Sequence, residues 1–343
     1  MRKPLVAIPS VPFHLLLALL TFACMTGNAA AWTVGFLTGS GGLGDESFND
    51  MTYKGLGQAK HELGIDIEVR QWEPEHSMEK LFLELVDKDP QLIILNGDQF
   101  NPLLQKYAEA FHSINFIAND FIATGKDGIT FPNVKSIAYS QHKGAFLAGV
   151  LAAEISRTQY IGFLGAIEMD IIKAFYTGFV EGVKYIAPSA RIAEKYVSRH
   201  PDYSGFNNPH AGFDMASSMY TEGVDIIFAV AGASGNGIIQ AAKKRKRYVI
   251  GVDSNQDHMA KGHVLTSVMK RLDTAVYNET IKAYHGRFQP GTAWYGLANG
   301  GIQLTPMKFT RHLISDKTRK ELQHITEKII SGKITVTNSL VEQ

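Results

Sequence analysis

The feature that most constrains the fold of this chain is the alternation of short apolar runs with longer helical patterns from Trp32 onward. Short apolar runs bounded by turn signals predict buried strands. The expected strands fall in two runs of five, at 33–37, 65–70, 92–95, 115–118 and 134–139, then at 161–164, 191–197, 225–230, 248–252 and 264–268. Helices are expected between them, for example at 53–63, 78–87, 102–111 and 174–185. Buried strands joined by crossover helices predict an α/β fold with parallel sheets covered on both faces.

Two runs of five strands indicate two doubly wound lobes rather than one large sheet. A chain of 343 residues, 45% of them hydrophobic, has room for two such cores. Both lobes contain a glycine-rich turn between a strand and a helix, at 38–50 and at 230–242. Because ligands of open parallel sheets bind outside the carboxyl ends of the strands, the cleft between the lobes is the expected functional site.

The first of these turns has Gly39, Gly41 and Gly44 in the spacing G-x-G-x-x-G, which is also the dinucleotide-binding fingerprint. A pyrophosphate would have to lie at the N-terminus of the following helix. Asp45 and Glu46 stand there and would repel it while capping the helix themselves. An NAD-dependent enzyme is therefore kept only as the less favoured alternative.

The charged and nucleophilic residues do not form a recognisable catalytic or metal site. His258 and His263 lack the i, i+4 spacing of a metal pair, and Ser47 is not in a G-x-S-x-G elbow. The net charge of +1 gives no reason to expect nucleic acid as a partner. We therefore expect a binding protein without catalytic residues, metal or cofactor.

The N-terminus has the pattern of an export signal. Arg2 and Lys3 precede an apolar segment, 13–23, and small residues follow it. Cleavage after Ala31 and lipidation of Cys24 are both compatible with this stretch, and the position of Cys24, the single cysteine, favours lipidation. Residues 1–31 are thus expected to be a targeting segment, and the mature protein to be periplasmic and membrane-anchored through Cys24.

Several longer motifs resemble one family. They are "GDESFND" at 44–50, "KGAFLAGVLAAEIS" at 143–156, "DIIFAVAGASGNGIIQAAKK" at 225–244 and "YVIGVDSNQDHMAKGHVLTSVMKRLDTAVY" at 248–277, with further matches at 161–188 and 295–306. These motifs occur in the same order as in the basic membrane protein family of type I periplasmic solute-binding lipoproteins, which the chain therefore resembles. That family includes purine nucleoside receptors and riboflavin receptors.

The resemblance implies two lobes joined by a hinge. The first lobe would contain residues 32–140 plus about 272–302, and the second 141–271 plus about 303–343. It further implies a monomer that delivers a small-molecule ligand to an inner-membrane ABC permease.

The resemblance also implies the residues that hold a flat ring. Phe48 and Phe206 would stack on its two faces, one from each lobe, although an aromatic residue near a helix start is as often part of the core. Asp45, Asn49, Asn119 and Asp120 are the candidates for its edge. For Asp45, a helix cap is an equally good interpretation.

The same resemblance implies a site for hydroxyl groups. Asp253 follows one strand and Lys270 the next, and together a carboxylate and an ammonium can hold vicinal hydroxyls. Gly232 and Ser234 resemble the family's loop on the sugar side, where a glycine permits close approach of the backbone.

Some residues depart from the family pattern and leave the ring undecided. Asp98 stands where relatives usually have an apolar or aromatic residue, which adds an acceptor at the edge of the cleft. His142 and Lys143 replace acidic residues. The expected ligand is a purine nucleoside, with riboflavin, another flat heterocycle that carries hydroxyls, as the alternative.

Overall fold

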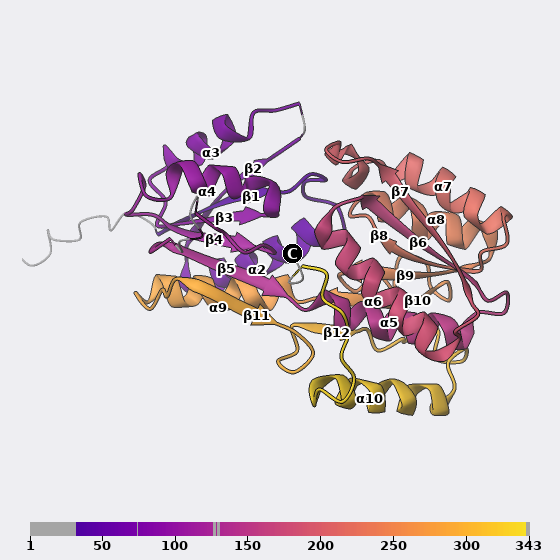
Figure 1. Cartoon of the computed structure of the whole chain (residues 1–343). Helices are drawn as coiled ribbons and strands as arrows, with labels where there is room; N and C mark the ends of the chain where they lie inside the picture. Colours follow the sequence, from indigo (N-terminus) through magenta and orange to yellow (C-terminus); the bar gives the residue numbers. More distant parts are fainter. Residues whose placement is uncertain (1–31, 74, 126–127, 129–130, 341–343) are drawn as a thin grey trace, which may run out of the picture.

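The computed structural model describes residues 32–340 except 74, 126–127 and 129–130. Two α/β lobes lie side by side, each with a central sheet covered by helices on both faces (Figure 1). The predicted architecture of two doubly wound lobes is confirmed. Among the residues described, no helix combines the length and apolar character needed to cross a membrane.

The first lobe has a six-stranded sheet in the order β11-β5-β4-β3-β1-β2, with all neighbours parallel. Its strands are β1 (Thr33–Thr38), β2 (Asp66–Gln71), β3 (Leu92–Asn96), β4 (Asn115–Asn119), β5 (Val134–Tyr139) and β11 (Gly291–Tyr295). Its helices are α2 (Phe48–Leu63), α3 (Met78–Val86), α4 (Asn101–Tyr107) and α9 (Leu272–Tyr284), with a short 3-10 turn, η1 (Asp98–Phe100).

The second lobe has the sheet order β12-β10-β9-β8-β6-β7, in which β12 runs antiparallel to β10. Its strands are β6 (Tyr160–Ile167), β7 (Arg191–Ser198), β8 (Ile226–Val230), β9 (Tyr248–Asp253), β10 (Val264–Lys270) and β12 (Ile302–Leu304). Its helices are α5 (Gln141–Ile155), α6 (Asp170–Ile186), α7 (Pro209–Thr221), α8 (Ser234–Arg245) and α10 (Asp316–Ile330), with the 3-10 turn η2 (Tyr203–Phe206).

The ten expected strands all form, whereas β11 and β12 were not expected. β11 is an edge strand whose residues alternate between half-buried and exposed, and β12 has three residues. Neither has the continuous apolar run that marks the central strands β3 and β8, in which every residue is buried.

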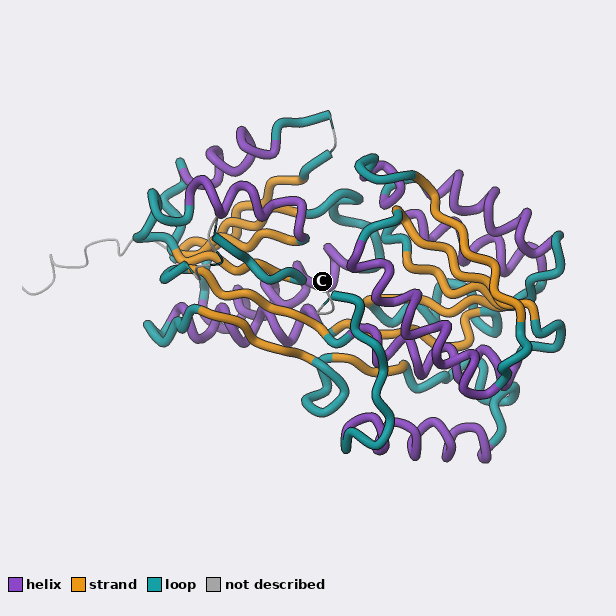
Figure 2. The backbone as a smooth tube through the Cα atoms, viewed as in Figure 1, coloured by secondary structure: helices purple, strands orange, loops and turns teal. Residues whose placement is uncertain are grey.

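The chain passes between the lobes three times: from β5 to α5, from β10 to α9 and from β11 to β12. Figure 2 shows the last of these passages, where the segment after β11 leads into the sheet of the other lobe. Each sheet therefore contains strands from distant parts of the sequence.

Helices α5 and α6 pack at very short range in the second lobe. A Cβ atom on Gly182 would lie 2.0 Å from the carbonyl oxygen of Phe146, and one on Gly178 would lie 2.1 Å from that of His142. Glycine is required at these positions because the backbone of one helix touches the backbone of the other.

Candidate ligand-binding cleft

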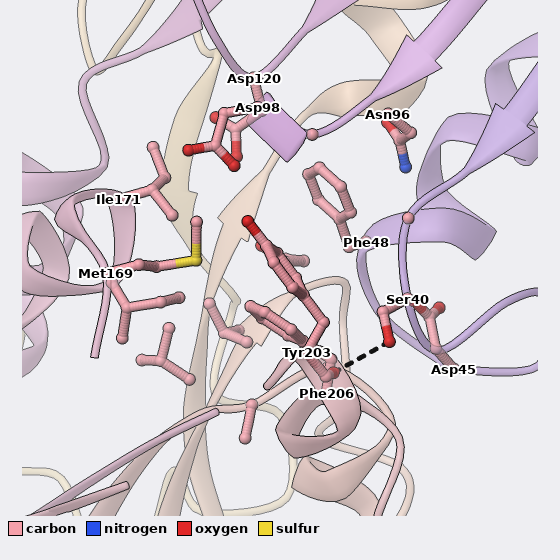
Figure 3. Close-up of a pocket in the computed structure, with 18 of the residues that line it drawn as sticks. Ser40, Asp45, Phe48, Asn96, Asp98, Asp120, Met169, Ile171, Tyr203 and Phe206 are labelled. Atoms are coloured by element: carbon pink, nitrogen blue, oxygen red, sulfur yellow. Dashed lines mark hydrogen bonds between the residues drawn. The ribbon is translucent and has the colours of Figure 1, made fainter. Parts of the chain in front are cut away.

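A cleft lies between the lobes at the carboxyl ends of the strands, and residues of both lobes line it. Figure 3 shows side chains from both lobes converging on it. Its place at the strand ends agrees with the general position of ligand sites in open α/β sheets.

The acidic residues of the cleft are positioned by the ends of strands. Asp98 and Asp120 follow β3 and β4 in the first lobe, and Asp253 ends β9 in the second. Asp120 and Asp253 have left-handed backbone conformations, with φ of 70° and 63°. Such conformations are uncommon outside glycine, and strained residues of this kind cluster at functional sites.

Aromatic side chains from both lobes form walls of the cleft. Phe48 comes from the first turn of α2, and Tyr203 and Phe206 come from η2. The rings of Tyr203 and Phe206 stack with centroids 6.4 Å apart and planes at 25°. Met169 and Ile171 add apolar surface (Figure 3).

Lys270 and Asp120 form an ion pair that joins the two lobes. The Lys270 Nζ lies 2.6 Å from the Asp120 Oδ2, and both side chains are almost completely buried. Burial raises the pKa of Asp120 to about 6, although the ammonium of Lys270 favours the charged carboxylate. The other carboxylate oxygen, Oδ1, has no hydrogen-bond partner among the described residues.

Asp253 forms a second polar contact between the lobes. Its Oδ2 accepts a hydrogen bond from the Ser47 hydroxyl at 2.7 Å. Burial raises the pKa of Asp253, and the charge of Lys270 and the bond from Ser47 oppose that shift. Three polar groups of the cleft, Lys270, Asp120 and Asp253, are thus electrostatically coupled.

Asp45 caps the N-terminus of α2 from within the glycine-rich turn. Its carboxylate accepts hydrogen bonds from the backbone N–H groups of Ser47, Asn49 and Asp50 at 2.9, 2.9 and 3.1 Å. Burial raises its pKa to about 7, while these bonds favour the charged form. The amides that a pyrophosphate would use are therefore bonded to the protein's own carboxylate, which weighs against the dinucleotide interpretation.

Eight of the eleven residues predicted to contact a ligand line the cleft: Asp45, Phe48, Asp98, Asp120, Phe206, Gly232, Asp253 and Lys270. The other three predicted residues, Asn49, Asn119 and Ser234, do not line it. The lining residues that were not predicted as contacts are Gly39, Ser40, Asn96, Gly97, Gln99, Met169, Ile171, Ile172, Phe175, Tyr203, Val230, Ala231 and Val252.

Asn49, Asn119 and Ser234 are fully buried and bonded to the protein itself. The Asn49 Oδ1 accepts from the backbone N–H of Gly39 at 2.9 Å, and the Asn119 Nδ2 donates to the Asn96 Oδ1 at 2.7 Å. The Ser234 hydroxyl donates to the Gly205 carbonyl at 2.7 Å. They hold the loops of the cleft in place.

Two lining aromatic residues, Phe175 and Tyr203, were not predicted from the sequence. Tyr203 stands three positions before Phe206 in a 3-10 helix, where side chains at i and i+3 lie on the same face. Recognising the turn "YSGF" as a 3-10 helix would have placed the two rings together.

Further hydrogen bonds close the mouth of the cleft. The Ser40 hydroxyl donates to the Tyr203 carbonyl at 2.9 Å, and the Gln256 Nε2 donates to the Glu46 carbonyl at 3.2 Å. The Ser254 hydroxyl donates to the same carbonyl of Glu46. The lobes are thus in contact on more than one side of the cleft, as in a closed form.

The remaining chemical predictions concern metals, histidine and the N-terminus. Within the described part of the chain, no group of three or more His, Cys, Asp or Glu side chains could hold a metal ion. His142 is buried, and burial lowers its pKa to about 4. Cys24 and the expected targeting segment 1–31 lie outside the described residues.

The comparison with protein families gives one match over almost the whole described chain. Residues 33–339 match the model described as "ABC transporter substrate-binding protein PnrA-like". Basic membrane protein D of Borreliella burgdorferi is 30% identical over 332 residues, 94% of each chain. The "ABC transporter nucleoside-binding protein BmpA" of Lactococcus lactis is 32% identical over 222 residues, 60% of each chain.

Solved structures support the same assignment. A solute-binding protein of an ABC transporter system from Aeropyrum pernix superimposes with a TM-score of 0.80 at 25% identity, covering 89% of this chain and 92% of that one. The family resemblance predicted from the motifs is therefore confirmed.

Proposed function

The chain belongs to the PnrA-like family of ABC transporter substrate-binding proteins, and from this premise we propose that its ligand is a purine nucleoside, captured between the lobes and handed to a membrane permease. The observation that carries the proposal is the composition of the cleft. It combines aromatic residues from both lobes with Asp253 and Lys270, which end the adjacent strands β9 and β10.

The aromatic residues of the cleft suit a ligand with a flat ring. A purine placed between Phe48 and Phe206 would contact both lobes through its two faces, and stacking needs no particular ring substituents. The apolar surface of Met169 and Ile171 suits the remaining edge of such a ring. This arrangement supports a heteroaromatic ligand over a sugar alone.

The polar residues of the cleft suit the hydroxyl groups of a sugar. Asp253 can accept hydrogen bonds from ribose hydroxyls, and Lys270, 2.6 Å from Asp120, can donate to them. The cleft has one lysine among four aspartates and no arginine or histidine among its lining residues. A phosphate group would meet net negative charge there, so we infer a nucleoside rather than a nucleotide.

Capture would proceed by closure. Because a ligand that contacts both lobes binds the closed form better than the open form, binding shifts the population toward closure. We infer that the permease recognises that form, and that lipidation of Cys24 keeps the protein at the membrane surface.

The direct test is to identify the ligand that purifies with the protein. Freshly purified protein is denatured, and the released small molecules are examined by absorbance and mass spectrometry. We expect a purine nucleoside that absorbs only in the ultraviolet and rebinds the refolded protein in calorimetry. A yellow sample with a visible absorption band would instead identify riboflavin. Binding of NAD with turnover, and no binding of nucleosides, would overturn the proposal in favour of an enzyme.

A further inference from the structure

We propose that Asp98 and Asp120 together select a ring that carries adjacent N–H donors on one edge, as a 2-amino-6-oxopurine does, over purines with fewer donors there. This inference rests on the proposed function of the cleft as a nucleoside site and names the purine class. Asp98 is then a specificity-determining residue of this chain.

The two carboxylates lie at the same end of the cleft. Asp98 begins η1 after β3 and Asp120 follows β4, and these strands are parallel neighbours with Asn96 opposite Asn119. Figure 3 shows the two side chains side by side, directed toward the space above Tyr203. The charge of Asp98 is one of the causes that raise the pKa of Asp120, as proximity of like charges requires.

Each carboxylate retains acceptor capacity. The Asp120 Oδ2 is bonded to Lys270, but its Oδ1 is buried without a partner among the described residues. The backbone N–H groups of Asp98 and Gln99 favour the charged form of the Asp98 carboxylate, and Asp98 is an exposed residue that lines the cleft, so its carboxylate is open to a ligand. An unpaired buried acceptor such as the Asp120 Oδ1 is costly, so a bound ligand is expected to supply a donor to it.

The neighbouring side chains do not supply those donors. The Gln99 Nε2 donates to the Asn96 carbonyl at 3.2 Å, and the Asn96 Nδ2 donates to the Asn49 Oδ1 at 2.9 Å. The Lys270 ammonium donates to the Asp120 Oδ2 and leaves the Oδ1 without a donor. The hydroxyl of Tyr203 lies on the same side of the cleft in Figure 3, and the charges of Asp170 and His200 also act on the Asp98 carboxyl.

Candidate rings differ in what they offer to two carboxylates. Guanine presents N1–H beside a 2-amino group, so three N–H bonds lie along one edge. Hypoxanthine lacks the amino group, and adenine places the N1 acceptor beside its 6-amino group. The flavin edge has one N–H between two carbonyl oxygens, which two carboxylates would repel. Donor complementarity therefore favours the guanine type.

The test is a comparison of nucleosides on the wild type and on Asp98→Asn. Dissociation constants for guanosine, inosine, adenosine and riboflavin are measured by calorimetry at pH 7.5. We expect the wild type to bind guanosine about tenfold or more tighter than inosine, the scale of a hydrogen bond to a charged group. In Asp98→Asn this ratio should fall at least about fivefold, because the amide loses the charge and half of the acceptor capacity, while inosine affinity stays the same or improves.

Asp87→Asn is the matched control, since Asp87 is an exposed acid in the same lobe outside the cleft. It should keep the guanosine-to-inosine ratio of the wild type. Equal affinity of the wild type for guanosine and inosine, or an unchanged ratio in Asp98→Asn, overturns this inference and leaves the nucleoside proposal standing. Preferential binding of riboflavin, or binding of none of the nucleosides, overturns both.

Discussion

At Lys270 a single ammonium group faces both lobes. It pairs with Asp120 across the cleft, favours the charged form of Asp253, and lies 5.1 to 5.6 Å from the ring centroids of Phe175, Tyr139 and Phe48. Contacts of an ammonium with aromatic faces add to its stabilisation when water is excluded. The carboxylates and aromatic rings around Lys270 thus offset the loss of its hydration on burial.

Truncation of either stacking ring is expected to weaken nucleoside binding. Phe48→Ala and Phe206→Ala should each cost about 1 to 3 kcal/mol, the scale of stacking between a base and an aromatic ring. Calorimetry would record this as a loss of about five- to 150-fold in affinity. Tyr53→Ala, an exposed aromatic residue of the same helix as Phe48, serves as the control and should bind as the wild type does. Wild-type affinity in both phenylalanine variants would contradict the stacked arrangement.

Nucleoside affinity is expected to fall in acid because Asp120 must accept hydrogen bonds from the ligand. Its pKa is about 6, so it gains a proton as the pH drops from 7.5 to 5 and loses acceptor capacity. Calorimetry across this range should show affinity declining by up to about tenfold per pH unit below pH 6. Asp120→Asn should bind more weakly at pH 7.5 and show a flatter pH profile. A flat profile in the wild type would argue against an ionised Asp120 as an acceptor.

The stability of the ligand-free protein should change in the opposite direction. The folded-state pKa of Asp120 lies above the ordinary value of 3.8, so the folded state binds this proton more readily than the unfolded chain. The contribution of this group to stability therefore rises as the pH falls from 7 through 6 toward 4. Asp45, with a pKa of about 7, acts in the same direction. Thermal unfolding of the empty protein should record a higher midpoint at pH 5.5 than at pH 7.5, and a lower one would contradict the shifts.

Polar residues at the ends of strands could be predicted from the sequence, but the direction of their side chains could not. Asp120 and Asn119 are consecutive, yet Asp120 lines the cleft while Asn119 is bonded to Asn96 and Thr52 behind it. Asn119 is the last residue of β4, whereas Asp120 has a left-handed backbone with φ of 70°, a conformation that the sequence pattern did not predict.

At the scale of elements, the close packing of α5 on α6 depends on the absence of side chains at their contact. Gly182→Ala places a Cβ where it would lie 2.0 Å from a backbone oxygen, so the helices must separate. Overpacking of this kind costs about 1 to 3 kcal/mol, and the thermal midpoint should fall. Gly57→Ala is the matched control, because it lies in α2 with no atom within 4 Å of the added Cβ. That change should leave stability unchanged or raise it by up to about 1 kcal/mol.

The central strands were predictable because they are buried along their whole length, and burial leaves a continuous apolar signal. The edge strand β11 reads Gly-Thr-Ala-Trp-Tyr and is half exposed, and β12 has three residues that pair antiparallel to β10. Such short edge strands are defined by the neighbour that they pair with. Their formation depends on tertiary contacts that no local pattern contains.

At the scale of the whole molecule, hydrogen bonds join the two lobes at residues that do not line the cleft. Ser254 donates from the second lobe to the Glu46 carbonyl of the first, and Ser254 does not line the cleft. Ser254→Ala should therefore weaken nucleoside binding about three- to tenfold, the value of one hydrogen bond, through a smaller closed population.

Two measurements separate this effect from a loss of ligand contacts. Small-angle scattering should show the empty Ser254→Ala variant more open than the wild type. Trp72 of the first lobe meets Tyr203 of the second with ring centroids 5.5 Å apart, so tryptophan fluorescence should report closure. Ser331→Ala, whose hydroxyl bonds within its own helix region, is the control. Wild-type affinity and scattering in Ser254→Ala would rule out this contact as a closing element.

The three passages of the chain between the lobes also determine when each lobe can finish folding during synthesis. The sheet of the first lobe lacks its outer strand, β11, until the ribosome has made residue 295, and the sheet of the second lobe lacks β12 until residue 304. Neither half is a continuous stretch that could finish folding while the other is still being synthesised. The nascent chain therefore keeps both sheets incomplete until residue 295 has been made, and a premature stop after β10 would leave two open sheet edges exposed to other chains.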